Sequence, residues 1–244
     1  SDGALANAFN FTGGTNTLSI ASTGIITGGI RTDGALDIAH DDASYTLSNI
    51  ISGTGSIAKS DTGTLILTGA NTYSGGTTIS GGTLSVSADN NLGVSSGTLT
   101  LGGGTLATTA SFASARDVTT LIGSGSDDIN VAASTEFALS GDISGGFGFA
   151  KTGDGTLVLS GDNTFLGLLS IREGVLNIQS NSALGSTSAN TTVSRGAALE
   201  LEGNITTGET VVLFGDGVSS DGAIRNASGA NTISGDLVLN ADSR

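Results

Sequence analysis

The sequence predicts an all-β fold, a parallel β-helix or solenoid of about 10 rungs. Three observations lead to this prediction: apolar residues alternate with hydroxyl residues in short runs, one segment of the chain is duplicated, and proline is absent from 244 residues that include 40 glycines. We expect residues 1–244 to form a single β-helical segment of a longer chain, since both ends, 1–3 and 241–244, resemble the ends of a fragment.

Short strands are the regular elements that the sequence predicts. Apolar residues sit in runs such as 65–67 (LIL), 83–86 (TLSV) and 98–101 (TLTL), with Thr or Ser beside or between them. A period of two is typical of strands with one buried face, and the period of an amphipathic helix is missing. Gly-Gly, Ser-Gly and Asn-Thr pairs separate the runs, as the corners of a coil require.

The strand pattern is duplicated along the chain. Residues 47–93 align without a gap on residues 139–185, at a shift of 92 residues, and 20 of the 47 positions are identical. A third, partial echo covers residues 229–240 and begins with GANTISG. Internal self-similarity of this kind indicates stacked units rather than one closed domain.

The spacing of the echoes predicts the length of a rung. Asn71, Asn163 and Asn231 are separated by 92 and 68 residues. Both intervals are close to multiples of about 23, which predicts four rungs and three rungs. Each rung pairs its backbone with the rungs on either side, so proline would remove a ladder hydrogen bond at almost any position, and glycine supplies the corners.

Composition excludes several classes of partner and site. The formal charge is -14, and the 8 Lys and Arg residues occur singly along the chain, so no basic patch could follow a nucleic acid backbone. The chain has no Cys, which excludes disulfides and thiolate metal sites, and only one histidine, His40. No apolar run approaches the ~20 residues of a membrane-spanning helix.

Residues 53–86 carry the resemblance to a known family, in the segment GTGSIAKSDTGTLILTGANTYSGGTTISGGTLSV. This segment resembles the autotransporter-associated β-strand repeat, which occurs in passengers of Gram-negative type V secretion systems. The second copy resembles the repeat less well, because Leu168-Leu169 and Arg172-Glu173 replace its polar residues.

The resemblance implies a right-handed parallel β-helix at the bacterial cell surface. It also implies export across the outer membrane by a C-terminal outer-membrane β-barrel that lies outside this fragment. Members of the family are commonly adhesins, aggregation factors, toxins or protease carriers.

One stretch, His40-Asp41-Asp42, has the residue types of a Ser-His-Asp catalytic set, with Ser44 or Ser48 as the nucleophile. The G-x-S-x-G turn that exposes a catalytic serine in many hydrolases is absent. We therefore interpret the stretch as a polar turn, and we predict no catalytic residue, no cofactor and no enzyme activity.

Residues 122–130 (IGSGSDDIN) partly resemble a calcium-binding β-roll nonapeptide, through Gly123, Gly125, Asp127 and Ile129. Such sites are built between tandem copies, and the chain has a single imperfect copy. We therefore predict no metal site there.

Two further candidate calcium ligands, Asp216 and Asp221, occur in the segment GDGVSSDG. We interpret both as turn residues. The sequence leaves open whether Asp127, Asp128, Asp216 or Asp221 binds calcium.

The repeat itself contains four conspicuous side chains, Lys59 with its counterpart Lys151, and Tyr73 with its counterpart Phe165. The lysines are available for anionic partners, but their equivalent position before a turn favours a structural cap or a solvated corner. We expect the two rings to fill equivalent core or corner positions. Residues 153–155 (GDG) lack the following helix that a phosphate site would need.

These observations predict a non-enzymatic surface segment that acts as a stalk or adhesin. Its partners would be a host or bacterial cell surface, protein or glycan, or a second copy of the chain in cell aggregation or biofilm. Two alternatives are a calcium-dependent module of the extracellular matrix or surface layer and a β-helical carbohydrate-active enzyme, which would need clustered acids in one groove.

Overall fold

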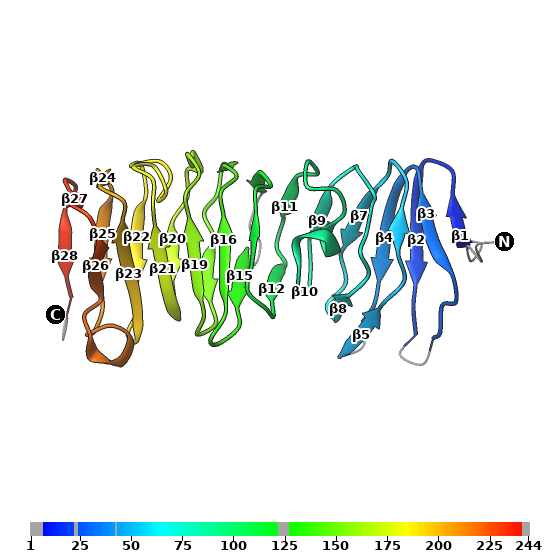
Figure 1. The fold of residues 1–244 in the computed structure, drawn as a ribbon, viewed down its shortest axis with the longest axis horizontal. Helices are drawn as coiled ribbons and strands as arrows, with labels where there is room; N and C mark the ends of the chain where they lie inside the picture. The colour runs from blue at the N-terminus through cyan, green and yellow to red at the C-terminus, as the bar shows by residue number, and fades with distance from the viewer. Residues whose placement is uncertain (1–6, 22–23, 42, 122–126, 241–244) are drawn as a thin grey trace.

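The computed structural model describes residues 7–21, 24–41, 43–121 and 127–240, which form the parallel β-helix that the sequence predicts (Figure 1). Each turn contributes up to three short strands, and strands of successive turns pair in parallel into sheets that run along the rod. The longest sheet has ten strands, so the prediction of about 10 rungs is confirmed. The handedness of the coil stays a prediction.

The rod has three sides, which the chain visits in the order 1, 2, 3. Side 1 carries β1 (Asn7–Phe11), β3 (Gly29–Thr32), β6 (Ile51–Ser52), β13 (Phe112–Ser114), β16 (Glu136–Leu139), β19 (Thr156–Leu159), β21 (Gly174–Ile178), β23 (Ala197–Glu202) and β26 (Ile224–Ser228). Side 2 carries β2 (Thr15–Ser19), β4 (Ala35–Ala39), β7 (Ser56–Lys59), β9 (Thr77–Ile79), β11 (Leu99–Leu101), β14 (Val118–Thr120), β17 (Ile143–Gly145), β24 (Thr206–Thr207) and β27 (Thr232–Ile233).

Side 3 is the continuous ten-stranded sheet. Its strands are β5 (Ser44–Leu47), β8 (Thr64–Leu67), β10 (Thr83–Val86), β12 (Thr105–Thr108), β15 (Asp128–Val131), β18 (Ala150–Thr152), β20 (Leu169–Ile171), β22 (Asn190–Val193), β25 (Thr210–Leu213) and β28 (Leu237–Leu239). Two 3-10 helices, η1 (Asp89–Leu92) and η2 (Val218–Ser220), interrupt the succession of strands.

Side 1 continues through its middle turns without regular strands. The Thr72 amide donates to the Ile51 carbonyl at 2.8 Å, and the Val94 amide donates to the Tyr73 carbonyl at 3.0 Å. The helix η1 in turn contacts β13. These bonds carry the stack from the first sheet of side 1 to the second.

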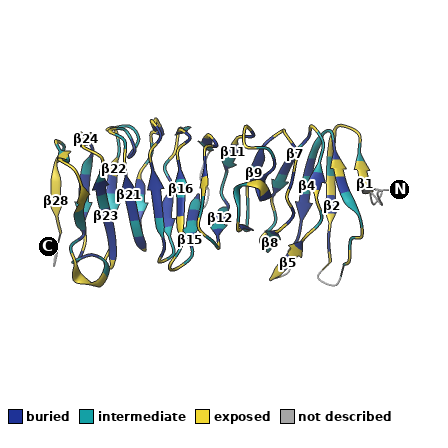
Figure 2. Cartoon of the chain, viewed as in Figure 1, coloured by how far each residue is buried: buried dark blue, intermediate teal, exposed yellow. Residues whose placement is uncertain are grey.

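One apolar core runs the length of the rod. Buried and partly exposed residues alternate along many strands (Figure 2), as in β8, where Leu65 and Leu67 are buried and the residues beside them are partly exposed. Parallel register stacks equivalent side chains, so Leu65 lies between Tyr45 and Leu84 of the neighbouring turns. The period-two pattern of the sequence therefore determines which side chains enter the core.

The two copies of the repeat sit on different sides of the rod. Lys59 lies in β7 on side 2, and Lys151 lies in β18 on side 3. The chain passes thirteen sides between them, which is four turns and one further side, so the predicted interval of four whole rungs is wrong by one side. The interval from Asn163 to Asn231 is three turns, as predicted, since both lie on side 2.

Close stacking of the turns generates a prediction for Gly55. A Cβ at this position would lie 1.9 Å from the Gly34 carbonyl oxygen of the previous turn. Gly55→Ala should lower the free energy of unfolding by about 2–3 kcal/mol, because backbone atoms must move apart to admit the methyl group.

Gly146→Ala is the matched control, because a Cβ at Gly146 meets nothing within 4 Å. It should change the free energy of unfolding by less than about 0.5 kcal/mol. Urea unfolding followed by circular dichroism measures both variants, and equal stability of the two would contradict the stacking argument.

Candidate functional site

The repeat lysines are buried caps of the backbone. Lys151 is 0% exposed, and its Nζ donates to the carbonyls of Thr152, Gly153 and Glu173 at 2.9, 2.6 and 3.0 Å. Lys59 is also 0% exposed, and its Nζ donates to the Asp61 carbonyl. Of the two predicted environments, the structural cap is the one observed, and neither ammonium group lies open to an anionic partner.

Burial weakens the basicity of both ammonium groups. Removal from water lowers the pKa of Lys151 to about 8, against a smaller opposing effect of the Glu173 and Asp154 carboxylates. Burial likewise lowers the pKa of Lys59. In both copies the lysine thus gives carbonyls of the corner a charged hydrogen-bond donor.

The repeat asparagines join three successive turns. Asn163 is 2% exposed; its Oδ1 accepts from the Ile143 amide at 2.8 Å, and its Nδ2 donates to the Ala183 carbonyl at 2.7 Å. Asn71 makes the same pair of bonds, from the Ile51 amide at 2.8 Å and to the Asn91 carbonyl at 2.6 Å. The only sign of this role in the sequence is that the asparagine is identical in the two copies of the repeat.

Of the two environments predicted for the repeat aromatics, core and corner, the core is the one observed. Tyr73 is 0% exposed, its hydroxyl lies 2.7 Å from Thr77 Oγ1, and burial raises its pKa to about 12. Phe165 is 1% exposed and meets Phe149 edge to face at 5.5 Å between ring centroids. Neither ring is available for stacking on a ligand.

Arg116 is a buried residue whose role the sequence did not reveal. It is 2% exposed, and its Nε lies 2.8 Å from Asp89 Oδ1. Its guanidinium also donates to the carbonyls of Gly93, Val94 and Gly97 at 2.7, 2.6 and 3.0 Å. Arg116 therefore satisfies the corner carbonyls that follow η1.

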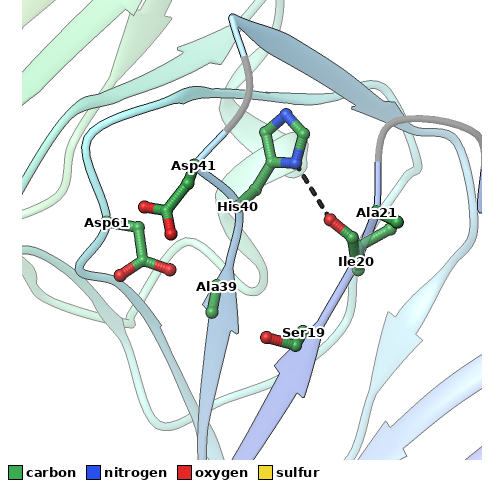
Figure 3. A pocket seen from close by; sticks show the side chains of 7 residues that line it. All are labelled: Ser19, Ile20, Ala21, Ala39, His40, Asp41 and Asp61. Atoms are coloured by element: carbon green, nitrogen blue, oxygen red, sulfur yellow. Dashed lines mark hydrogen bonds between the residues drawn. The ribbon is translucent and has the colours of Figure 1, made fainter.

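His40 lines a pocket of about 360 Å³ together with Asp41 and Asp61 (Figure 3). The ring is 1% exposed, its Nδ1 donates to the Ile20 carbonyl at 3.1 Å, and its Nε2 is buried without a hydrogen-bond partner. Figure 3 shows the ring turned away from both carboxylates.

The serines proposed as nucleophiles, Ser44 and Ser48, are exposed. Because Nε2 of His40 has no partner, neither hydroxyl is bonded to that nitrogen. Asp42, the third member of the stretch, lies outside the described residues. The geometry therefore brings His40 to the core and does not join it to a serine.

Aspartates at the corner between sides 1 and 2 accept hydrogen bonds from the next turn. Asp117 Oδ1 accepts from the Asp142 amide at 3.1 Å, and Asp142 Oδ1 accepts from the Asp162 amide at 2.8 Å. Asp162 Oδ1 accepts from the hydroxyls of Ser180 and Ser182 at 2.9 and 3.1 Å. These carboxylates therefore connect successive turns.

The candidate calcium ligands fall in two separate places, Asp127 with Asp128 and Asp216 with Asp221. Asp127 Oδ1 accepts from the Gly103 amide at 2.5 Å, and Asp128 lies 3.6 Å from Arg172 Nη1. Asp221 donates its amide to the Val218 carbonyl at 3.1 Å, within the turn that begins at Asp216. Among the described residues no group of three or more His, Cys, Asp or Glu side chains could hold a metal ion. Gly123 and Gly125 lie outside those residues.

The outer faces carry rows of hydroxyl side chains in register. On side 3 the row is Ser44, Thr64, Thr83 and Thr105. On side 2 the row is Thr78, Thr100, Thr119 and Ser144. Each row lies on the side of its strands opposite the buried residues, so the hydroxyls face the solvent at the spacing of the turns.

Two comparisons place the chain among known proteins. A family model described as the passenger-associated-transport-repeat matches residues 57–86 and 149–178. The adhesin BmaC autotransporter of Brucella suis biovar 1 (strain 1330) is 36% identical over 173 residues. The chain is a segment of an autotransporter passenger.

The aligned part is 70% of this passenger segment and 5% of the Brucella protein, so the chain spans a small fraction of the relative it matches. No solved structure matches the segment. None of the helices among the described residues has the length and hydrophobicity of a membrane span.

Each matched repeat of the passenger segment covers five consecutive sides of the rod. The first runs from β7 to β10, and the second runs from β18 to β21. The same unit therefore folds on either set of sides, because in both copies its Asn side chain bonds to the turn before and the turn after rather than to one particular side.

The asparagine bonds generate a prediction. Asn163→Ala removes a buried acceptor for Ile143 and a buried donor for Ala183, so it should lower the free energy of unfolding by about 2–4 kcal/mol. Thr164→Ala, at the exposed neighbour, should change it by less than about 0.5 kcal/mol. Urea unfolding measures both, and a harmless Asn163→Ala would refute the bridging role.

A buried acid near the C-terminal turns predicts a pH dependence. Glu209 is 2% exposed, its Oε2 has no partner, and burial raises its pKa to about 7. The folded chain then binds more protons than the unfolded chain between about pH 4.5 and 7, so stability falls as pH rises through that window.

Glu209→Gln should therefore stabilise the segment at pH 8 and leave its stability nearly unchanged at pH 4. Unfolding in urea at the two pH values measures the difference. Glu136→Gln, at an exposed position, is the control and should show no comparable change between pH 4 and 8. A stability gain from Glu209→Gln that is the same at both pH values would argue against a buried, titrating carboxyl.

Proposed function

We propose that this passenger segment is a non-enzymatic stalk with adhesive sides, exported across the outer membrane to the cell surface. The Brucella relative is named an adhesin, and the passenger-associated-transport-repeat ties the chain to export. In the full protein, a C-terminal outer-membrane barrel is the partner that carries such a passenger to the surface.

The observation that supports adhesion best is the outward rows of short hydroxyl side chains. Thr78, Thr100 and Thr119 lie in register on consecutive turns of side 2, and none belongs to the core. A flat, hydroxyl-bearing surface can make many weak hydrogen bonds to a protein or glycan surface at once. The buried side chains of Asn163 and Lys151, by contrast, bond to the backbone of neighbouring turns.

The same flat sides support a second part of the proposal, self-association of passengers in cell aggregation. Two such surfaces can pair side by side, since each presents donors and acceptors at the same spacing along the rod. The charge of -14 opposes this pairing at low salt, so we expect it to strengthen as ionic strength rises.

The adhesion test displays the full passenger on a non-adherent bacterial strain. Thr100→Glu with Thr119→Glu places two charges in the middle of the side 2 row, and attachment to host cells should fall at least fivefold. Ala138→Glu, on side 1, adds a charge outside the row and should leave attachment within twofold. Unchanged attachment of the Thr100→Glu, Thr119→Glu variant would refute the row as the adhesive surface.

Self-association is measured on the purified segment by sedimentation equilibrium. We expect a concentration-dependent dimer that increases with salt. A monomer throughout the accessible concentration range, in low and high salt alike, would refute self-association and leave adhesion to other surfaces in place.

A further inference from the structure

Four large apolar side chains are exposed together on one corner of the rod, between sides 2 and 3. They are Leu121, Phe147, Leu166 and Leu168, which are 47%, 42%, 55% and 48% exposed. We call them the corner patch.

The members of the corner patch come from three consecutive turns. Leu121 follows β14 and Phe147 follows β17, which are paired strands of side 2. In the next turn the Leu166 amide donates to the Gly145 carbonyl at 3.0 Å. The patch is therefore contiguous along the rod rather than a scatter of single residues.

The duplication supplies an internal comparison for the patch. Leu166 and Leu168 occupy the positions of Ser74 and Gly76 in the first copy. The first copy folds into the same five-sided unit without an apolar residue at either position. The fold therefore does not require the two leucines, and their exposure to water calls for another reason.

A pocket of about 260 Å³ opens beside the patch. Phe147, Phe149 and Leu168 form its apolar wall. Asp127 and Asp128 line it as well, with Arg172 and Ser170 at the same pocket.

The acids of this pocket are incompletely satisfied. Asp127 is 4% exposed, and its Oδ2 has no hydrogen-bond partner. Asp128 has Arg172 as a partner at 3.6 Å, and the Arg172 side chain is 49% exposed. Burial raises the pKa of both carboxyls, against the smaller opposing effects of the Gly103 amide on Asp127 and of Arg172 on Asp128. The pocket thus offers an apolar wall beside two carboxylates.

We propose that the corner patch docks another protein and that the pocket takes a lysine or arginine side chain of that partner. The aliphatic stem of such a side chain lies against Phe147 and Leu168, and its cation is drawn to Asp127 and Asp128. This deepens the proposed function, because it names the place on the passenger where a protein partner binds.

Charge selects this occupant over two others. A second copy of the chain would bring a second set of carboxylates against the first, and the chain has 22 acidic against 8 basic residues. An anionic lipid surface is repelled for the same reason. A basic residue flanked by apolar residues matches both halves of the site.

The test uses the purified segment and fluorescent synthetic peptides, measured by fluorescence anisotropy. The first peptide alternates Leu and Arg over 12 residues, the second replaces every Arg with Glu, and the third replaces every Leu with Ser. We expect the Leu-Arg peptide to bind at least tenfold more tightly than either of the others.

Variants separate the corner patch from general attraction of a cation to an acidic protein. Leu166→Ser with Leu168→Ser, which makes the second copy resemble the first, should weaken binding of the Leu-Arg peptide at least tenfold. Asp128→Asn should weaken it about fivefold. Ser74→Ala, at the corresponding place in the first copy, should leave binding unchanged, and thermal unfolding verifies that each variant is folded.

Equal affinity of the wild type and the double leucine variant for the Leu-Arg peptide would overturn the proposal. A dimer of the wild type that disappears in the double leucine variant would overturn it too, and would assign the patch to a second copy. Binding to anionic vesicles that the leucines control would assign it to a lipid surface.

The adhesion assay keeps this proposal distinct from the proposed function. If the displayed passenger attaches equally well with and without Leu166 and Leu168, and the peptide results are also unchanged, the patch proposal fails and adhesion stands. If no attachment occurs at all, the adhesive function fails, and the peptide measurements still decide the patch.

Discussion

The structure depends on one constraint, which is that every turn must satisfy the backbone groups of the turns on either side of it. On the strands the parallel ladders do this, with ten strands in register along side 3. At the corners the ladder is interrupted, and the exposed ends of the backbone need other partners. Several of the buried polar side chains supply partners at these corners.

Lys151, Asn163 and Arg116 supply hydrogen-bond partners to the backbone at the corners in three ways. The lysine gathers carbonyls of two neighbouring turns at one ammonium, the asparagine links the turn before and the turn after, and the arginine closes the corner behind η1. Each is buried at a cost in desolvation that its hydrogen bonds offset. The role of these three polar residues is therefore structural: they hold the turns of the rod together.

The outside of the rod is left free to vary. The two copies of the repeat keep their inward lysine, asparagine and aromatic residues, while outward positions change from Ser74 to Leu166. Because neighbouring turns touch mainly through inward side chains and backbone, a substitution on the outer face has little effect on stability. A passenger built this way can carry hydroxyl rows on one stretch and an apolar corner on another without changing its fold.

The sequence by itself determined the class of fold and the number of turns. Alternation of apolar residues at period two, the absence of proline and the duplication are local properties, and a solenoid is built from local contacts between adjacent turns. The equivalence of Tyr73 and Phe165 followed from the same reasoning, since they replace each other in the repeat, while the choice between core and corner positions was left open.

Only the tertiary structure decided which residues meet across turns. The number of residues in a turn varies with its corners, so a spacing of 92 residues could not reveal that the second copy is displaced by one side. The same uncertainty hid the partners of Arg116 and Glu209 and the gathering of Leu121, Phe147 and Leu166 on one corner. Those contacts depend on which side of the rod each residue occupies. That position is set by the number of residues in every corner that precedes it in the chain.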